Sequence, residues 1–369
     1  MRNYQQELLN IIFLLNLLIL KSHLQSTKTN FFGTLLKYGV PLVISVGLCW
    51  LLFSNDDIDL AGMMEIVRRE CDFRWILLNL LLGIMAQVFR AARWQIQLRA
   101  LDIRPPFRQL VLSIFGTYSV NLVFPRLGEV WRTGYIAARE RAPFTTVFGS
   151  MVADRLADTL TVLILLLLTF IPAGAQLREY LGQSGGALAR ISEILGSPLL
   201  WGFVIAAMAA VWFVFVRFPE HKVIARLRSI ISGLWKGFAV VVTMPGRGRW
   251  LIFTVLIWSC YIMSLYCAFR AFPLTAEVLV IHGPTALAVC FVLTSLAMGV
   301  PSNGGIGPWQ WAMIFGLTLY SAGVAGLTHE YALTFANLVM GVQTLMLIVQ
   351  GLFTFGCIAF SKRSKPLSK

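Results

Sequence analysis

The sequence from Val147 to Ile171 reads VFGSMVADRLADTLTVLILLLLTFI. Its second half is an unbroken apolar run, and as a helix the whole stretch is long enough to cross the roughly 30 Å hydrocarbon core of a bilayer. Its first half carries Asp154, Arg155 and Asp158. A charged side chain at the bilayer centre costs about 2.5–3.5 kcal/mol on insertion scales, so such residues normally face protein or a watery path and have a partner. The stretch therefore predicts a membrane-spanning helix with one polar face.

The composition of the 369 residues supports a membrane protein. Hydrophobic residues make up 57% and charged residues 13% of the chain, and the mean hydropathy is +0.74, which is too apolar for a soluble domain of this length. The formal net charge of +14 comes from Lys and Arg that gather in loops, as the positive-inside rule predicts. We therefore expect an all-α, polytopic integral membrane protein that binds no nucleic acid.

Cysteine and histidine give no support to a metal or redox site. The six cysteines and four histidines are scattered, and none has the spacing of a zinc site or a thioredoxin-type motif. We expect no metal and no cofactor, and no enzymatic activity.

Repeated apolar runs define the predicted domain. They lie at about 38–53, 74–89, 109–124, 147–171, 199–216, 251–272, 284–300, 309–327 and 332–360. They predict about seven to nine transmembrane helices, re-entrant segments included, in one domain at 35–361, followed by a basic cytoplasmic tail at 362–369. An acidic linker at 53–74 separates the first two runs. For residues 1–34 two interpretations stay open, an amphipathic surface helix or a stretch that precedes the native start.

The run at 109–124 is predicted to be re-entrant. If it crossed the membrane fully, the very basic loop at 217–250 would lie outside, against the positive-inside rule. If it dips in and returns, every later basic loop lies inside. The run is short, contains Asn121 and ends at Pro125, which fits a segment that turns back within the membrane.

A second interruption lies in the other half of the chain. Residues 299–308 read GVPSNGGIGP, and this sequence separates two short apolar runs. Two interrupted hydrophobic segments in the two halves of a chain indicate a transporter binding site between inverted repeats. A tight turn between helices explains the same residues, and both interpretations stay open here.

The charged residues at 154–158 need cations nearby. On a helix Asp154 and Asp158 share a face, whereas Arg155 points about 100° away. The two carboxylates would repel each other unless cations or protons intervene. Two pairs of arginines qualify as partners: Arg90 with Arg93, or Arg126 with Arg132.

Arginine also suits a lipid phosphate, because its planar guanidinium can bind two oxygens at once. Arg90 and Arg93 are three residues apart, so on a helix they point the same way. Glu129 and Arg132 have the same spacing and are predicted to pair across one helical turn. The alternative is an ion-pair network that only holds helices together.

Three motifs in this order resemble a known family. They are Asn121…Pro125-Arg126-x-Gly128-Glu129-x-x-Arg132, Asp154-Arg155-x-x-Asp158 and Pro301-x-x-Gly304-Gly305-x-Gly307. Together they are similar to the lysylphosphatidylglycerol synthase transmembrane, or flippase-like, family over roughly residues 35–360. The resemblance implies a helical domain with re-entrant elements that moves a polar lipid between leaflets. Bifunctional members add a soluble aminoacyl-transferase domain, which we do not expect in this chain.

The leading hypothesis is therefore a lipid, or lipid-linked solute, transporter in the bacterial plasma membrane with a cytoplasmic C-terminus. Membrane lipids are the expected partners, and a partner enzyme or a homo-oligomer is left open. The alternatives are a lipid-modifying transferase and a non-transporting scaffold. The candidate residues for head-group binding or the substrate path are Arg90, Arg93, Asn121, Arg126, Glu129, Arg132, Asp154, Arg155, Asp158, Asn303, Gly304 and Gly305.

Overall fold

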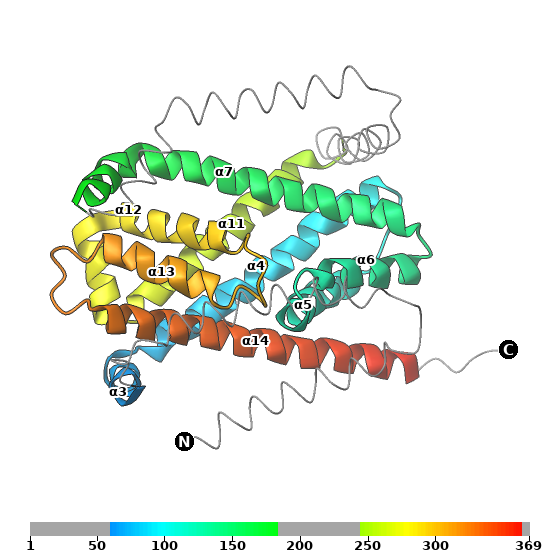
Figure 1. The fold of residues 1–369 in the computed structure, drawn as a ribbon. Helices are drawn as coiled ribbons and strands as arrows, with labels where there is room; N and C mark the ends of the chain where they lie inside the picture. Colours follow the sequence, from blue (N-terminus) through cyan, green and yellow to red (C-terminus); the bar gives the residue numbers. More distant parts are fainter. Residues whose placement is uncertain (1–59, 184–243, 364–369) are drawn as a thin grey trace, which may run out of the picture.

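The structure, a computed structural model, describes residues 60–183 and 244–363. Within these ranges it contains nine helices and no strand, which confirms the all-α prediction (Figure 1). The helices are α3 (Leu60–Glu70), α4 (Phe73–Ala100), α5 (Phe107–Val123), α6 (Leu127–Glu140), α7 (Phe144–Gln183), α11 (Arg247–Arg270), α12 (Pro273–Ala297), α13 (Pro308–Leu319) and α14 (His329–Arg363). The predicted runs at 38–53 and 199–216, the segment 1–34 and residues 364–369 of the tail lie outside the described residues.

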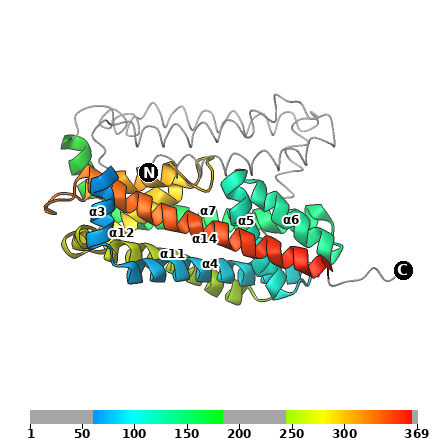
Figure 2. The same cartoon turned by 90° about the horizontal axis from the view of Figure 1, so that it is seen from below.

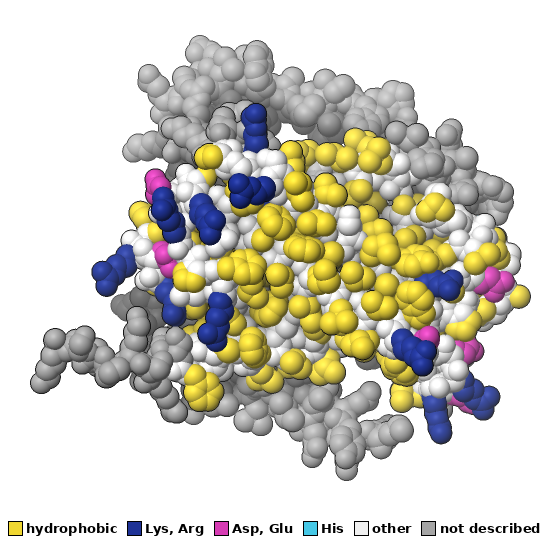
Figure 3. Space-filling model, turned by 180° about the vertical axis from the view of Figure 1, so that it is seen from behind, with side chains coloured by type: hydrophobic (Ala, Val, Ile, Leu, Met, Phe, Trp, Pro, Cys, Tyr) yellow, Lys and Arg dark blue, Asp and Glu magenta, His cyan; other side chains and the backbone are white. Residues whose placement is uncertain are grey.

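Four of the described helices, α4, α11, α12 and α14, are long and apolar enough to cross a membrane. The 40-residue α7 also exceeds the length needed, and its apolar middle from Thr159 to Gln176 carries no charged residue. In the space-filling view a broad apolar belt covers the middle of the molecule, and arginines gather at its two ends (Figure 3). This distribution is that of a polytopic membrane protein.

Helix α4 extends well beyond the predicted run at 74–89. It begins at the N-cap Asp72, whose side chain accepts a hydrogen bond from the Arg74 backbone N–H at 3.0 Å. It continues to Ala100 although Arg90 and Arg93 interrupt the apolar pattern. The apolar run ends there because the face of α4 that meets the other helices becomes polar, while the helix itself continues.

Helices α5 and α6 form a hairpin. The turn between them contains Arg126 in the left-handed region, with φ 62°. The side chain of Asn121 closes the hairpin, since its Oδ1 accepts a hydrogen bond from the Gly128 backbone N–H at 2.8 Å. The chain thus reverses at residues 124–126, which agrees with a return after the run at 109–124, and the re-entrant position of this run in a membrane stays a prediction.

Gly128 permits the close approach of α5 and α6, and we expect Gly128→Ala to separate them. An added Cβ would lie 2.1 Å from the Thr117 carbonyl oxygen and 2.7 Å from Asn121 Oδ1. We predict a loss of about 1–3 kcal/mol in the free energy of unfolding, measured by unfolding in detergent. Gly134→Ala on the same helix is the control, because a Cβ there meets nothing within 4 Å. It should be neutral or stabilise by up to about 1 kcal/mol, and an equal loss in both variants would contradict the prediction.

Helices α12 and α13 form a second hairpin. Helix α12 is broken at Gly283, with φ 65°, and it continues from Pro284 to Ala297. The loop at 298–307 then uses left-handed glycines, and the side chain of Gln310 accepts a hydrogen bond from the Gly307 N–H at 2.7 Å. The predicted run at 309–327 is longer than α13, which ends at Leu319 and is followed by a turn.

The two hairpins meet end to end alongside α14. Ser119 of α5 donates a hydrogen bond to the Leu347 carbonyl at 2.6 Å, whereas the loop before α13 packs near Met340. These two positions lie about 27 and 17 Å along α14, a helix of about 52 Å, at 1.5 Å per residue. Figures 1 and 2 show α5 and α6 beside one half of α14 and α13 beside the other. The hairpins therefore enter from opposite ends and their turns meet near the middle.

Two helices were not predicted from the apolar runs. Helix α3 lies within the stretch predicted as an acidic linker, and α6 follows the first turn. Both are short and rich in charge, so they produce no apolar run. Helix α3 is held by the hydroxyl of Tyr331, which donates to Glu70 Oε2 at 2.8 Å.

Candidate functional site

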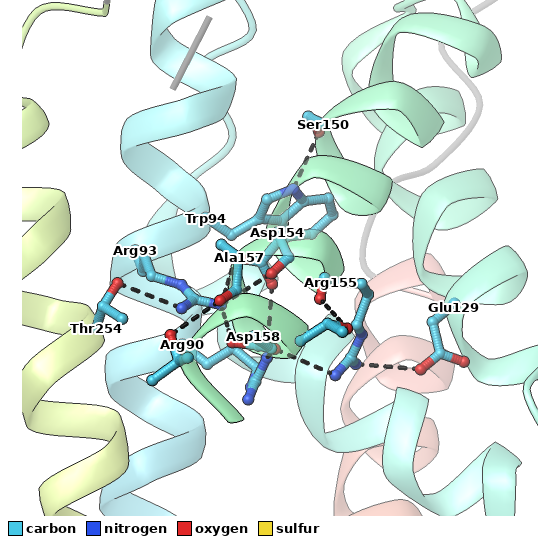
Figure 4. Close-up of polar contacts among 12 residues, drawn as sticks. Arg90, Arg93, Trp94, Glu129, Ser150, Asp154, Arg155, Ala157, Asp158 and Thr254 are labelled. Atoms are coloured by element: carbon cyan, nitrogen blue, oxygen red, sulfur yellow. Dashed lines mark hydrogen bonds and ion pairs between the residues drawn. The ribbon is translucent and has the colours of Figure 1, made fainter. Parts of the chain in front are cut away.

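The carboxylates of α7 are paired with the arginines of α4. Arg93 Nη2 lies 2.7 Å from an oxygen of Asp154 and 2.7 Å from an oxygen of Asp158. Arg90 also donates to Asp158 and lies 3.6 Å from Asp154. Of the two arginine pairs left open by the sequence, the structure therefore selects the pair on α4. The close-up shows these side chains between α4 and α7 (Figure 4).

The pairing continues from α7 to α6 and α5. Arg155 contacts Glu129 at 3.1 Å and lies 3.6 Å from Asp158, so it joins the two acidic groups. Glu129 in turn accepts hydrogen bonds from the Asn121 side chain at 3.3 and 3.4 Å. The predicted pair of Glu129 with Arg132 is wrong, because Glu129 is held by Arg155 across the helix interface.

We call the six ionised residues the charge network. They are Arg90, Arg93, Glu129, Asp154, Arg155 and Asp158, three cations and three anions. The network is closed at one side and reachable at the other, since Asp154 and Arg93 are fully buried while the Arg155 side chain is 32% exposed. Charges at this depth interact strongly because little water screens them.

Neutral and aromatic groups support the buried side. Arg93 donates to the hydroxyl of Thr254 on α11 at 3.3 Å, and its guanidinium lies 5.3 Å from the Trp250 ring. Trp94 donates to Ser150 of α7 at 3.1 Å. Sequence reasoning missed Thr254 and Trp250, because a single threonine or tryptophan in an apolar helix carries no signal of its own.

Arg132 lies next to the charge network but outside its pairing. Its side chain is fully buried, and its guanidinium stacks 4.3 Å from the Trp94 ring. None of its three side-chain nitrogens has a hydrogen-bond partner among the described residues.

The turns of the two hairpins form a separate contact. Arg126 is exposed, and its Nη2 donates to the Gly299 carbonyl at 2.5 Å. Gly304 adjoins Leu122, since a Cβ on Gly304 would lie 2.4 Å from Leu122 Cδ2. We call these four residues the turn contact.

Of the twelve predicted site residues, the charge network and Asn121 form one group. Arg126 and Gly304 belong to the turn contact, and Asn303 and Gly305 lie in the same loop. The two groups meet on α5, where Asn121 holds Glu129 and the next residue, Leu122, packs on Gly304. The turn contact and the charge network are therefore adjacent on α5.

No metal site accompanies these residues in the described part of the chain. Within residues 60–183 and 244–363, no group of three or more His, Cys, Asp or Glu side chains could hold a metal ion. The acidic groups of the site are neutralised by arginines instead.

Apolar helices around a buried charge network and two opposed hairpins define a polytopic helical membrane protein. Comparison with protein families makes this specific. The chain belongs to the family described as the Lysylphosphatidylglycerol synthase TM region, whose model matches residues 39–351. The resemblance noted in the sequence is thereby confirmed.

Curated relatives are distant. Glycosyltransferase AglD of Haloferax volcanii is 26% identical over 294 residues, which cover 73% of this chain and 46% of that protein. A UPF0104 membrane protein of Methanothermobacter thermautotrophicus is 26% identical over 275 residues, 69% of this chain and 78% of the relative. A UPF0104 membrane protein of Methanocaldococcus jannaschii is 26% identical over 127 residues, 33% and 38% of the two chains. The chain thus spans less than half the length of the first and third of these relatives. No solved structure is significantly similar.

Proposed function

We propose that the protein moves a polar-headed lipid, or a lipid-linked solute, between the two leaflets of its membrane, and that it is not itself an enzyme. The observation that carries this proposal is the meeting of two oppositely directed hairpins beside a buried charge network. Interrupted segments that enter from both sides and meet near the middle are a hallmark of transporter sites.

The depth of the charge network fits a path for a head group. Arg90 lies ten residues before the end of α4, about 15 Å along the helix. Purely structural helix contacts in membranes rarely need ionised groups at this depth, because packing of small and neutral residues is sufficient. A polar head group loses its bound water when it enters the membrane. A partly exposed set of charges can form hydrogen bonds with the head group in place of that water.

The charge of the two ends supports a cytoplasmic C-terminus. At the end that holds the C-terminal part of α14 lie the end of α4, the start of α5, the end of α6 and the start of α11. They carry the exposed arginines Arg99, Arg104, Arg108, Arg139, Arg141, Arg247 and Arg249, with two acidic residues, Asp102 and Glu140. The opposite end balances Arg68, Arg69, Arg74 and Arg270 with Glu65, Glu70, Asp72, Glu277 and Glu330. The positive-inside rule places the basic end in the cytoplasm, which we propose to be that of a bacterial cell.

Arg126→Ala tests this function. Because Arg126 is exposed and its main contact is the Gly299 carbonyl, the variant should unfold within about 0.5 kcal/mol of the wild type. We expect it to lose transfer of a head-group-labelled phospholipid in reconstituted vesicles, measured as the label that a membrane-impermeant quencher reaches over time. Arg139→Ala, an exposed arginine at the far end of α6, is the control and should transfer normally. Wild-type rates in both variants would reject the role of the turn contact, and no transfer by the wild type would reject the function.

A second candidate is a lipid-linked transferase. It is favoured by the name of the Haloferax volcanii relative, a glycosyltransferase, although only 46% of that protein is matched. In this chain the carboxylates that could act as acid and base are held in ion pairs with arginines. Formation of a glycosylated lipid by the purified chain from a labelled sugar donor would establish this candidate in place of the transporter.

A further inference from the structure

Arg132 lies beside the charge network, and among the described residues its guanidinium has no ion-pair partner. The charge network is neutral as a set of six, and Arg132 adds one positive charge. The charges near its guanidinium include those of Arg155, Asp154 and Glu129, but each of these residues already has its own ion pair. The guanidinium is thus buried with a full charge and no acceptor among the described residues.

Such an arrangement carries a large cost in free energy. A buried ion without a partner is strongly unfavourable, and arginine does not escape the cost by releasing its proton. The Trp94 ring at 4.3 Å offsets part of the cost through its π face. The edge of the guanidinium, where the N–H groups lie, receives nothing from this stacking. The N–H donors of Arg132 are therefore held in place without a hydrogen-bond acceptor among the described residues.

We infer that Arg132 is the anion-binding group of the site and takes a singly charged phosphodiester. This inference rests on the proposed function and names the substrate class for it. A guanidinium fork binds two phosphate oxygens at once, and Trp94 fixes its plane. One unpaired positive charge matches a phosphodiester, which carries one negative charge. A phosphomonoester carries about 1.5–2 negative charges near pH 7 and would leave an excess.

The accessible side of the charge network supplies the entrance. Arg155 and Glu129 are 32% and 19% exposed and pair at 3.1 Å, and Glu129 lies one helical turn before Arg132 on α6. We therefore place the entrance for the head group at this pair, next to the buried guanidinium. The Asn121 contact to Glu129 ties that opening to the position of the α5–α6 hairpin.

The experiment measures thermal unfolding of the purified full chain in detergent, with each of four additives. These are phosphatidylglycerol, a diester lipid; phosphatidate, a monoester lipid; diacylglycerol, which has no phosphate; and glycerophosphoglycerol, the soluble diester head group. We expect phosphatidylglycerol to raise the unfolding temperature most and diacylglycerol least. A comparable rise with glycerophosphoglycerol would assign the recognised group to the head group alone. Equal effects of diester and monoester would overturn the charge match.

Arg132→Met provides the decisive variant. Because it removes an unpaired buried charge, the lipid-free variant should be at least as stable as the wild type, while its apparent affinity for phosphatidylglycerol should fall at least ~30-fold. Lower stability together with an unchanged lipid response would show a structural role and overturn the inference. Transfer between leaflets is measured on the same samples. If the wild type and Arg132→Met transfer lipid equally well, the anion-binding role of Arg132 is rejected and the proposed function stands. If the wild type responds to the diester but transfers no lipid, only the proposed function is rejected.

Discussion

Arg93→Met should lower the free energy of unfolding by about 3–5 kcal/mol, because it removes the nearest cation of the buried Asp154 and leaves Arg90 as the remaining α4 cation for both carboxylates. Arg93 is fully buried and lies 2.7 Å from oxygens of both Asp154 and Asp158. Methionine fills much of the same volume, so the loss reports on charge more than on packing. Reversible unfolding in mixed micelles measures it.

Two controls separate this effect from a general sensitivity to arginine loss. Arg69→Met removes an exposed partner of Glu65 on α3 and should cost about 1 kcal/mol or less. Adding Asp154→Asn to Arg93→Met should recover about 0.5–3 kcal/mol, because the double variant no longer buries the Asp154 carboxylate without its nearest cation. If Arg93→Met and Arg69→Met cost the same, the charge network contributes nothing to stability.

The sequence was sufficient for the helices that are both long and apolar. The runs that became α4, α7, α11 and α14 combine length with hydropathy, and each is within reach of a bilayer thickness. Helices α3 and α6 gave no apolar run, because each is shorter than four turns and carries charged residues on one face and apolar residues on the other. The mean hydropathy of a window does not detect such a helix, whose signal is the 3.6-residue periodicity of its apolar face.

For the site, residue types were predicted and pairings were not. Charge at 154–158 required cations, yet two arginine pairs met that requirement equally well from sequence. Only the packing of α4 against α7 shows that Arg90 and Arg93 are the partners of Asp154 and Asp158. Glu129 was assigned to Arg132 by local spacing, but a contact across helices to Arg155 is what the fold provides. Local periodicity specifies which residues share a face of one helix, but it does not specify which face of which other helix packs against them.

Joining the two hairpins at their turns should block leaflet transfer. Leu122 and Gly304 are the positions to link, because a Cβ on Gly304 would lie 3.9 Å from Leu122 Cα, within reach of disulfide geometry. In a background without other cysteines, Leu122→Cys with Gly304→Cys should form a disulfide under mild oxidation. If a head group passes between the hairpins, the turns must separate, so the oxidised protein should transfer lipid at least about tenfold more slowly.

Reduction should restore the rate, which makes each sample its own control. The single variants Leu122→Cys and Gly304→Cys should respond to neither oxidant nor reductant, and Gly304→Cys also measures the cost of a side chain at φ 65°. A fully cross-linked protein that transfers lipid at the reduced rate would mean that the turns stay together during transport. The head group would then have to pass along the exposed side of Glu129 and Arg155 with the hairpins closed. Asn121, which holds Glu129, and Leu122, which packs on Gly304, are neighbours on α5. That result would therefore show that the charge network can work while the turn contact beside it stays closed.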